Sequence, residues 1–209
     1  MIVAIDGPAG AGKSTVARAL AARLGFRYLD TGAMYRALTW LALERGVRLE
    51  DGAALAALAR EHPVAFAEGD AIAVAGHDVT LAIREARIDA AVPVVARHPE
   101  VREVMRERQR ALGRRGDSVI EGRDIGVVVV PDAEVKVWLT AAAEVRAQRR
   151  GAERGEADQV ELAAELHRRD ERDAVNTHRA ADAVEVDTTR LTLEEVVDRI
   201  AAVIEERAA

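Results

Sequence analysis

The sequence predicts an α/β fold in which helices flank a parallel β-sheet. Short apolar runs alternate along the chain with segments whose apolar residues recur at helical spacing, and this alternation favours strands joined by right-handed helical crossovers. A glycine-rich segment follows the first apolar run directly, as expected where a strand ends in a ligand-binding turn. A chain of 209 residues is long enough for one such domain with room for a small insertion.

Each element is predicted from its own stretch of sequence. Strands are expected at 2–5, 26–29, 118–120, 135–139 and 183–186, because bounded apolar runs are typical of a buried parallel sheet. Helices are expected at 14–24, from Asp30 or Thr31 to Gly46, at 81–112 with breaks near Pro93 and Pro99, and at 142–150, 159–172 and 192–204. Residues 63–79 alternate around turns at 68–70 and 76–78, which predicts a small antiparallel meander.

Composition limits the possible classes of function. The chain has no cysteine, which excludes disulfides and thiol chemistry, and its five scattered histidines lack metal-ligand spacing. A net charge of -6 argues against a broad nucleic-acid-binding surface. No apolar run has the length of a membrane span, and no secretory signal precedes the first strand. We therefore expect a soluble cytoplasmic protein that binds neither nucleic acid nor a membrane. Separately, we expect it to act as a monomer.

A phosphate-binding loop is predicted between the first strand and the first helix. Residues 7–14 fit the pattern G-x-x-x-x-G-K-[ST], whose backbone N–H groups surround phosphate oxygens at a helix N-terminus. Lys13 is expected to reach the outer phosphates, and the Ser14 hydroxyl to ligate Mg²⁺. The expected phosphate-binding residues are Gly7, Pro8, Ala9, Gly10, Ala11, Gly12, Lys13, Ser14 and Thr15.

Polar residues also follow the second and third expected strands, at the same edge of the sheet. Thr31 and Arg36 come after the second strand, and Arg123 and Asp124 come after the third. Taken alone, the first group is compatible with a helix cap and a solvated arginine, and the second with an ion pair in a turn. The functional alternative is that both groups bind a second anion beside the phosphate loop.

Arginines gather in three helical segments. Those at 102–110 recur every four residues among glutamates, which favours a solvated, salt-bridged face. Those at 146–154 precede a glycine-containing connector and suit a flap that clamps phosphate and stacks on a base. Taken alone, the third group favours a charged surface at a helix end. The arginines are Arg102, Arg106 and Arg110; Arg146, Arg149, Arg150 and Arg154; and Arg168, Arg169 and Arg172.

These segments, in this order, resemble the bacterial cytidylate kinases. The resemblance rests on 5–14, 29–36, 99–102 with 109–110, 122–126 and 168–173, and it covers nearly the whole chain. It includes the small β insertion near 60–85, which separates that family from adenylate and uridylate kinases. It implies a P-loop NTPase core in one kinase domain, 1–209, with the core at 1–60 and 98–209, an NMP-binding insertion at about 61–97 and a short arginine-rich lid at about 148–160.

The resemblance also implies roles for individual residues. Thr31, Arg102 and Asp124 would line a cytosine pocket, while Arg36 and Arg123 would hold the acceptor phosphate. The implied substrate contacts are Thr31, Arg36, Arg102, Arg123, Asp124, Arg169 and Asp173; the donor contacts outside the loop are Arg146 and Arg150; and the catalytic residues are Lys13, Arg36, Arg123 and Arg169.

The implied reaction is direct in-line transfer from ATP, with Mg²⁺, to CMP or dCMP. A P-loop kinase for another small acceptor, such as UMP or shikimate, is the first alternative, and a nucleotide-dependent switch module is the second. Two positions depart from the family pattern. Pro93 stands where the family commonly has serine, and Asn176 stands where it has a further arginine, for which Arg179 is the nearby substitute.

Overall fold

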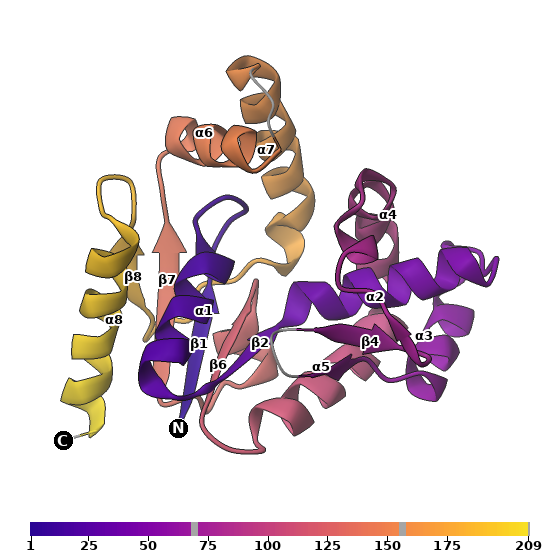
Figure 1. The fold of residues 1–209 in the computed structure, drawn as a ribbon, viewed down its shortest axis with the longest axis horizontal. Coiled ribbons are helices and arrows are strands. Elements are labelled where there is room, and N and C mark those ends of the chain that lie inside the picture. The colour runs from indigo at the N-terminus through magenta and orange to yellow at the C-terminus, as the bar shows by residue number, and fades with distance from the viewer. Residues whose placement is uncertain (68–70, 155–157, 209) are drawn as a thin grey trace. The chain divides into compact units, whose positions relative to one another are not determined.

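The structure, a computed structural model, describes residues 1–67, 71–154 and 158–208 (Figure 1). The chain divides into two compact units. The first consists of Met1–Leu29 and Gly113–Ala209, and the second of Asp30–Leu112. The second unit therefore includes residues 30–60 and 98–112 in addition to the expected insertion. The bounds of that insertion and of the lid remain predictions.

A five-stranded sheet forms the centre of the first unit. Its order is β2 (Arg27–Asp30), β6 (Ser118–Gly122), β1 (Ile2–Asp6), β7 (Val135–Thr140) and β8 (Val184–Asp187). β1 pairs in parallel with β6 and β7, and β7 pairs in parallel with β8. Val3, Ile5 and Val135 are fully buried. The predicted parallel sheet is confirmed. The carboxyl ends of β1 and β6 lie side by side, with Asp6 paired to Gly122.

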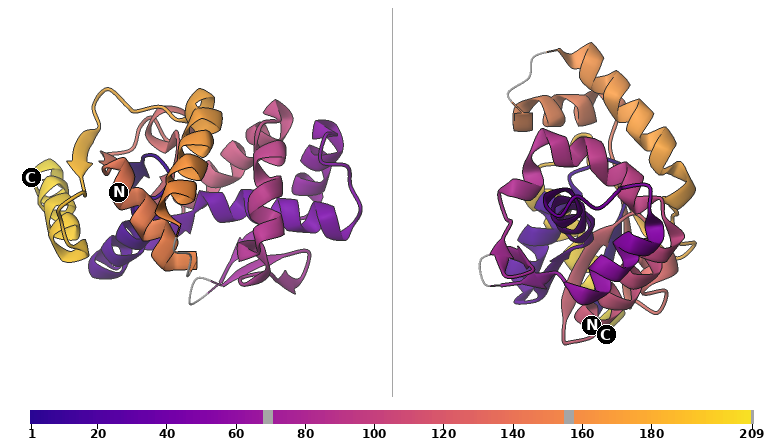
Figure 2. Two further views of the ribbon diagram at one scale, coloured as in Figure 1. Left: turned by 90° about the horizontal axis from the view of Figure 1, so that it is seen from above. Right: turned by 90° about the vertical axis from the view of Figure 1, so that its right-hand side faces the viewer.

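Helices α1 (Lys13–Leu24) and α8 (Leu193–Ala208) pack together beside the sheet (Figure 2). Val16 and Leu20 of α1 share a buried cluster with Val196 and Ile200 of α8. The helical spacing of these apolar residues creates the packed face. α1 ends at Gly25, whose φ of 69° is left-handed.

Two further helices form a hairpin in the first unit. α6 (Ala143–Arg154) and α7 (Gln159–Asp173) lie beyond the tip of β7, at the same end as the loop that joins β1 to α1 (Figure 1). Ala147, Leu162 and Leu166 pack with Ala9 of that loop. α6 continues past Arg150, so the predicted end of this helix is wrong. Packing offsets the helix penalty of the buried Gly151, which is about 1 kcal/mol. Residues 155–157, in the expected connector and lid, lie outside the described residues.

The second unit is built around α2 (Thr31–Glu44). This helix contacts α3 (Gly52–Glu61), α4 (Ala86–Ala96) and β4 (Ile72–Val74). β4 pairs antiparallel with both β3 (Ala65–Phe66) and β5 (His77–Asp78), which confirms the predicted small sheet. The short helix η2 (Ala82–Arg84) and the longer α5 (Pro99–Gly113) complete the order of elements.

The second unit corrects two expectations and contains one helix that the sequence analysis missed. The turn expected over 76–78 lies at Ala75 and Gly76, whose φ values are 51° and 80°, and the next two residues belong to β5. The expected turn at 68–70 lies outside the described residues. α3 was not predicted, although Asp51 caps it by accepting a hydrogen bond from Ala54 N at 2.9 Å. The expected break near Pro93 is absent, because α4 continues through this proline.

Burial explains why α4 tolerates Pro93. A proline inside a helix removes one backbone hydrogen bond and costs about 3 kcal/mol. Ile88 and Val95 of α4 are fully buried, so the packing of this helix against α2 offsets that cost. Among the described residues, no helix is both long and apolar enough to cross a membrane.

Candidate active site

The glycine-rich loop joins β1 to α1, as its sequence pattern requires. Gly7, Gly10 and Gly12 have φ values of 151°, 74° and 89°. These positive angles suit residues without a Cβ. The Lys13 Nζ atom donates to the carbonyl oxygen of Pro8 at 2.8 Å, so the lysine folds back over its own loop. Ser14 and Thr15 are exposed in the first turn of α1.

Asp6 joins the end of β1 to the turn that follows β6. Its Oδ1 and Oδ2 atoms accept hydrogen bonds from the backbone N–H groups of Ile125 and Gly126, each at 2.8 Å. The residue is 4% exposed. The pKa of Asp6 is raised to about 6, chiefly by burial and to a smaller extent by the nearby Asp124. The two backbone N–H groups and Lys13 oppose this rise. Our sequence analysis did not assign Asp6 to the site, although an acidic residue ending an apolar strand is a usable signal.

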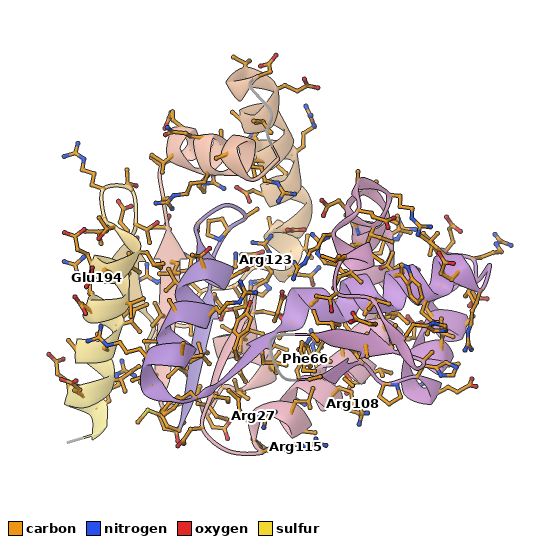
Figure 3. The ribbon with its side chains drawn as sticks, in the orientation of Figure 1. Arg27, Phe66, Arg108, Arg115, Arg123 and Glu194 are labelled. Carbon is orange, nitrogen blue, oxygen red and sulfur yellow. The ribbon has the colours of Figure 1, made fainter. Side chains whose placement is uncertain are left out.

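Arg123 connects the same turn to the loop and to α7. It lies after β6 (labelled in Figure 3), with Nη1 donating to Gly7 O at 2.8 Å and Nη2 to Asp173 Oδ2 at 2.9 Å. Asp124 beside it is buried. The structure thus brings three predicted substrate residues, Arg123, Asp124 and Asp173, into the unit that contains the phosphate loop. The side chain of Arg169 lies outside the described residues.

Arg146 holds the loop from the α6–α7 hairpin. Its Nη1 donates to Ala9 O at 3.0 Å and pairs with Asp170, whose Oδ1 accepts from Ala9 N at 3.3 Å. Among the described residues, Arg146 Nε is a buried donor without a hydrogen-bond partner. A Cβ on Gly10 would lie 3.0 Å from Arg146 Cβ, so the hairpin approaches the loop closely.

A cavity of about 330 Å³ lies beside the loop. Arg149 lines it, donating through Nη1 and Nη2 to the Thr188 hydroxyl and carbonyl, each at 2.8 Å. Our sequence analysis noted Arg149 but assigned the donor contacts to Arg146 and Arg150, and both of these assignments remain predictions. The lining residues are Gly10, Ala11, Gly12, Thr15, Val16, Arg149, Ala152, Thr188, Leu191, Thr192, Leu193 and Val196.

Two predicted acceptor residues lie at the start of the second unit. Thr31 is the first residue of α2, and Asp30 caps the helix by accepting from Ala33 N at 2.8 Å. Arg36 pairs with Asp89, and its Nη1 donates to Ile83 O at 3.1 Å. Its side chain is 13% exposed, so the interpretation of Arg36 as a solvated arginine is wrong.

The arginines of α5 are also more buried than expected. Arg102, Arg106 and Arg110 are half-buried, whereas the glutamates between them are exposed. The expected solvated face is therefore wrong. Helical spacing instead places these arginines beside Met105 and Gln109, which are 3% and 2% exposed.

Arg179, the nearby substitute for the family arginine absent at Asn176, forms an ion pair, and its substitution for that arginine remains a prediction. Arg179 pairs with Glu185 of β8. Asn176 ends the short helix η4 (Ala174–Asn176), which follows α7. The next residues approach the turn after β6, since His178 N donates to Arg123 O at 3.1 Å.

The parallel sheet and its phosphate loop define the class of P-loop kinases. The shikimate kinase of Bacteroides thetaiotaomicron has the same fold, with a TM-score of 0.50 at 16% sequence identity over 98% of each chain. The chain belongs to the cytidylate kinase family, whose model matches residues 3–206. It is 50% identical to the cytidylate kinase of Geobacillus sp. (strain WCH70), over 98% of this chain and 96% of the relative. It is 45% identical to the cytidylate kinase of Bacillus licheniformis, over 100% of this chain and 97% of the relative.

Proposed function

We propose that this protein transfers the γ-phosphoryl group of ATP to CMP and dCMP, giving CDP and dCDP. Membership of the cytidylate kinase family supports the reaction. The observation that carries the proposal is the position of Arg123, whose guanidinium bonds to Gly7 of the phosphate loop and to Asp173. A cation that would bind the acceptor phosphate therefore lies beside the loop that would bind the donor.

The chemistry requires positioning and charge neutralisation rather than a general base. A CMP phosphate is already an anionic nucleophile, so the protein must hold two polyanions in line and exclude water. Lys13 would neutralise the donor phosphates, and Arg36 and Arg123 the acceptor phosphate. The Arg169 position would add a further cation, as the family resemblance implies.

Mg²⁺ fits the residues present at the loop. Among the described residues, no cluster of acidic and histidine side chains could hold a metal by itself. Kinase sites bind Mg²⁺ through few protein ligands together with substrate phosphates. The exposed hydroxyl of Ser14, one residue after Lys13, suits that role. When bound, the ion would neutralise charge on the donor phosphates.

The cavity beside the loop is our proposed position for the donor base. Arg149 is held there by Thr188, and a fixed guanidinium can stack on an aromatic ring. The unpartnered Nε of Arg146 offers a hydrogen bond to the donor nucleotide. We further propose that the enzyme acts as a monomer, because the loop, Arg123 and Asp173 meet within one unit of the chain. We also propose a cytoplasmic location, which suits a chain without cysteine. The net charge of -6 favours free nucleotides over nucleic acid as ligands.

One assay separates this function from its alternatives. ATP consumption should be measured with CMP, dCMP, UMP, AMP or shikimate, and without an acceptor. We expect the highest kcat/KM with CMP and slow hydrolysis without acceptor. A higher kcat/KM with shikimate or AMP would replace the proposed acceptor. Acceptor-independent turnover would instead favour a nucleotide-dependent switch.

The choice of base is expected to depend on Asp124. Cytosine presents an amino donor where uracil presents a carbonyl, so a carboxylate at this position favours CMP. Asp124→Ala should raise the KM for CMP and narrow the ratio of kcat/KM for CMP to that for UMP. Steady-state kinetics with both substrates measure this, with the exposed Asp132→Ala as the matched control. An equal loss on both substrates would make Asp124 a purely structural residue.

The choice of sugar is expected to depend on Asp173. With Pro93 in place of a hydroxyl side chain, we expect one remaining contact to the 2′-hydroxyl. This contact is worth about 0.5–1.5 kcal/mol, or roughly a two- to twelve-fold preference for CMP over dCMP in kcat/KM. Asp173→Ala should bring the ratio close to one. Activity on both substrates should also fall, because Arg123 loses its partner.

The wild-type ratio itself tests this account of the sugar. A preference for CMP above about a hundredfold would require sugar contacts other than Asp173. The segment containing Asn176 would then be examined first, because it follows α7 directly.

A further inference from the structure

A buried carboxylate lies between the phosphate loop and the turn that carries Arg123 and Asp124. We propose that Asp6 is a positioning residue that sets the choice of acceptor, because it fixes this turn relative to the loop. The inference deepens the proposed function and rests on it. Asp6 would act through the turn rather than by touching the nucleotide.

The first support is the geometry of the two hydrogen bonds. Each carboxylate oxygen of Asp6 accepts one backbone N–H, from Ile125 and from Gly126, at 2.8 Å. These two residues begin the helical turn η3 (Ile125–Val129). The first N–H groups of a helical segment have no partner within it, so they need an external acceptor. Asp6 supplies that acceptor from a different strand.

The second support concerns the residue that normally caps such a turn. Asp124 immediately precedes η3, but its side chain makes no capping hydrogen bond. An aspartate in this position commonly accepts from the backbone two or three residues later. Asp6 binds one of these groups, the N–H of Gly126, two residues after Asp124. The start of the turn is therefore held from β1 by Asp6, and not by a cap from Asp124.

The third support is a second connection at the adjacent residue of the loop. Gly7 follows Asp6 and accepts a hydrogen bond from Arg123 through its carbonyl oxygen. A Cβ on Gly7 would lie 2.1 Å from Leu139 O, so Gly7 is confined against β7. Asp6 and Gly7 are therefore consecutive residues that bind the chain before and after Asp124: Gly7 binds Arg123, and Asp6 binds Ile125 and Gly126. The turn that carries Arg123 and Asp124 is therefore bound by Asp6 and by Gly7, the first residue of the phosphate loop.

Close packing and charge keep the Asp6 carboxylate in place. A Cβ on Gly126 would lie 3.2 Å from the Lys136 stem and 3.5 Å from Asp6 Oδ2. The Lys136 ammonium pairs with Asp182 at 2.9 Å, while Lys13 and Asp124 are the charged groups that act on Asp6. The pKa of Asp6, about 6, leaves its carboxylate ionised above neutral pH, as both N–H bonds require.

Asp6→Asn tests the proposal with little change in volume. The amide retains one acceptor oxygen and sets an NH₂ group against the other backbone N–H. We expect KM for CMP to rise about tenfold and the CMP-to-UMP ratio of kcat/KM to fall, while KM for ATP changes less than about twofold. Asp117→Asn makes the same change on an exposed carboxylate. It should alter neither of the two KM values nor the CMP-to-UMP ratio of kcat/KM.

Gly126→Ala provides a second approach should Asp6→Asn fail to fold. The added methyl group would press on the same turn. We expect KM for CMP to rise and the CMP-to-UMP ratio of kcat/KM to fall, each by less than in Asp6→Asn. Thermal unfolding, measured in parallel, identifies variants that remain folded at the assay temperature. If every folded variant of Asp6 or Gly126 loses activity equally on CMP and UMP, with equal rises in KM for CMP and ATP, the positioning role is wrong.

Asp124→Ala separates failure of this inference from failure of the proposed base contact. If Asp124→Ala narrows the CMP-to-UMP ratio and the Asp6 and Gly126 variants do not, the role of Asp6 is overturned and the base contact stands. If Asp124→Ala leaves the ratio unchanged, the proposed base contact fails. In that case the test of Asp6 is whether its variants raise KM for CMP more than KM for ATP. An equal rise in both KM values overturns the positioning role of Asp6.

Discussion

Lys13→Ala is expected to reduce kcat by about a thousandfold or more while the protein stays folded. The Lys13 Nζ atom lies over the loop, 2.8 Å from Pro8 O, where donor phosphates would bind. Removing it takes away a fixed positive charge that opposes the negative charge of the transferring group. Because the side chain is only partly buried, we expect the free energy of unfolding to change by about 0.5 kcal/mol at most.

Steady-state kinetics with ATP and CMP measure kcat, and urea unfolding measures the free energy of unfolding. Arg18→Ala is the matched control, because it removes one positive charge from the same helix. Arg18 lies over the ring of Tyr28, at 5.1 Å from its centroid. The control should keep near-normal turnover. If Lys13→Ala also kept it, the assignment of residues 7–14 as the donor site would be wrong.

Gly7→Ala is expected to cause the largest loss of stability of any glycine-to-alanine substitution in the loop. The backbone φ of Gly7 is 151°, and an added Cβ would lie 2.1 Å from the carbonyl oxygen of Leu139. The methyl group must displace β7 or the loop, since a backbone oxygen in a sheet cannot rotate away. Strain and overpacking together should lower the free energy of unfolding by about 3 kcal/mol or more.

Gly25→Ala separates backbone conformation from crowding in this experiment. Gly25 also has a positive φ, 69°, but no atom lies within 4 Å of its added Cβ. We therefore expect a loss of about 1–2 kcal/mol from conformation alone. Urea midpoints and slopes give both values. If Gly7→Ala destabilised the protein no more than Gly25→Ala, the close approach to Leu139 would be ruled out.

Local sequence patterns were sufficient to predict the sheet and the glycine-rich loop between β1 and α1. Apolar runs such as 2–5 and 135–139 become buried strands because parallel strands are covered on both faces. The loop pattern also fixes its own context, since a strand must precede it and a helix must follow. The start of α8 is likewise set by nearby residues. Thr192 and Glu195 cap this helix reciprocally, with Thr192 N donating to Glu195 Oε2 at 2.7 Å.

Features that depend on contacts between distant segments were harder to predict. Pro93 suggests a helix break, yet packing around Ile88 and Val95 keeps α4 continuous. Asp6 and Arg149 acquire their positions from Gly126 and Thr188, which lie far away in the sequence. No periodicity within one segment can indicate such pairs, so their roles emerge only from the folded arrangement.

The order of the strands has a consequence for synthesis of the chain. β1 is made first, but its partners β6 and β7 begin at Ser118 and Val135, so most of the chain must leave the ribosome before β1 can pair. The second unit is continuous in sequence from Asp30 to Leu112, and all its segments emerge earlier. Closure of so long a loop is entropically costly and slow. Until β6 emerges, the apolar first strand is without its native neighbours and available for aggregation or chaperone binding.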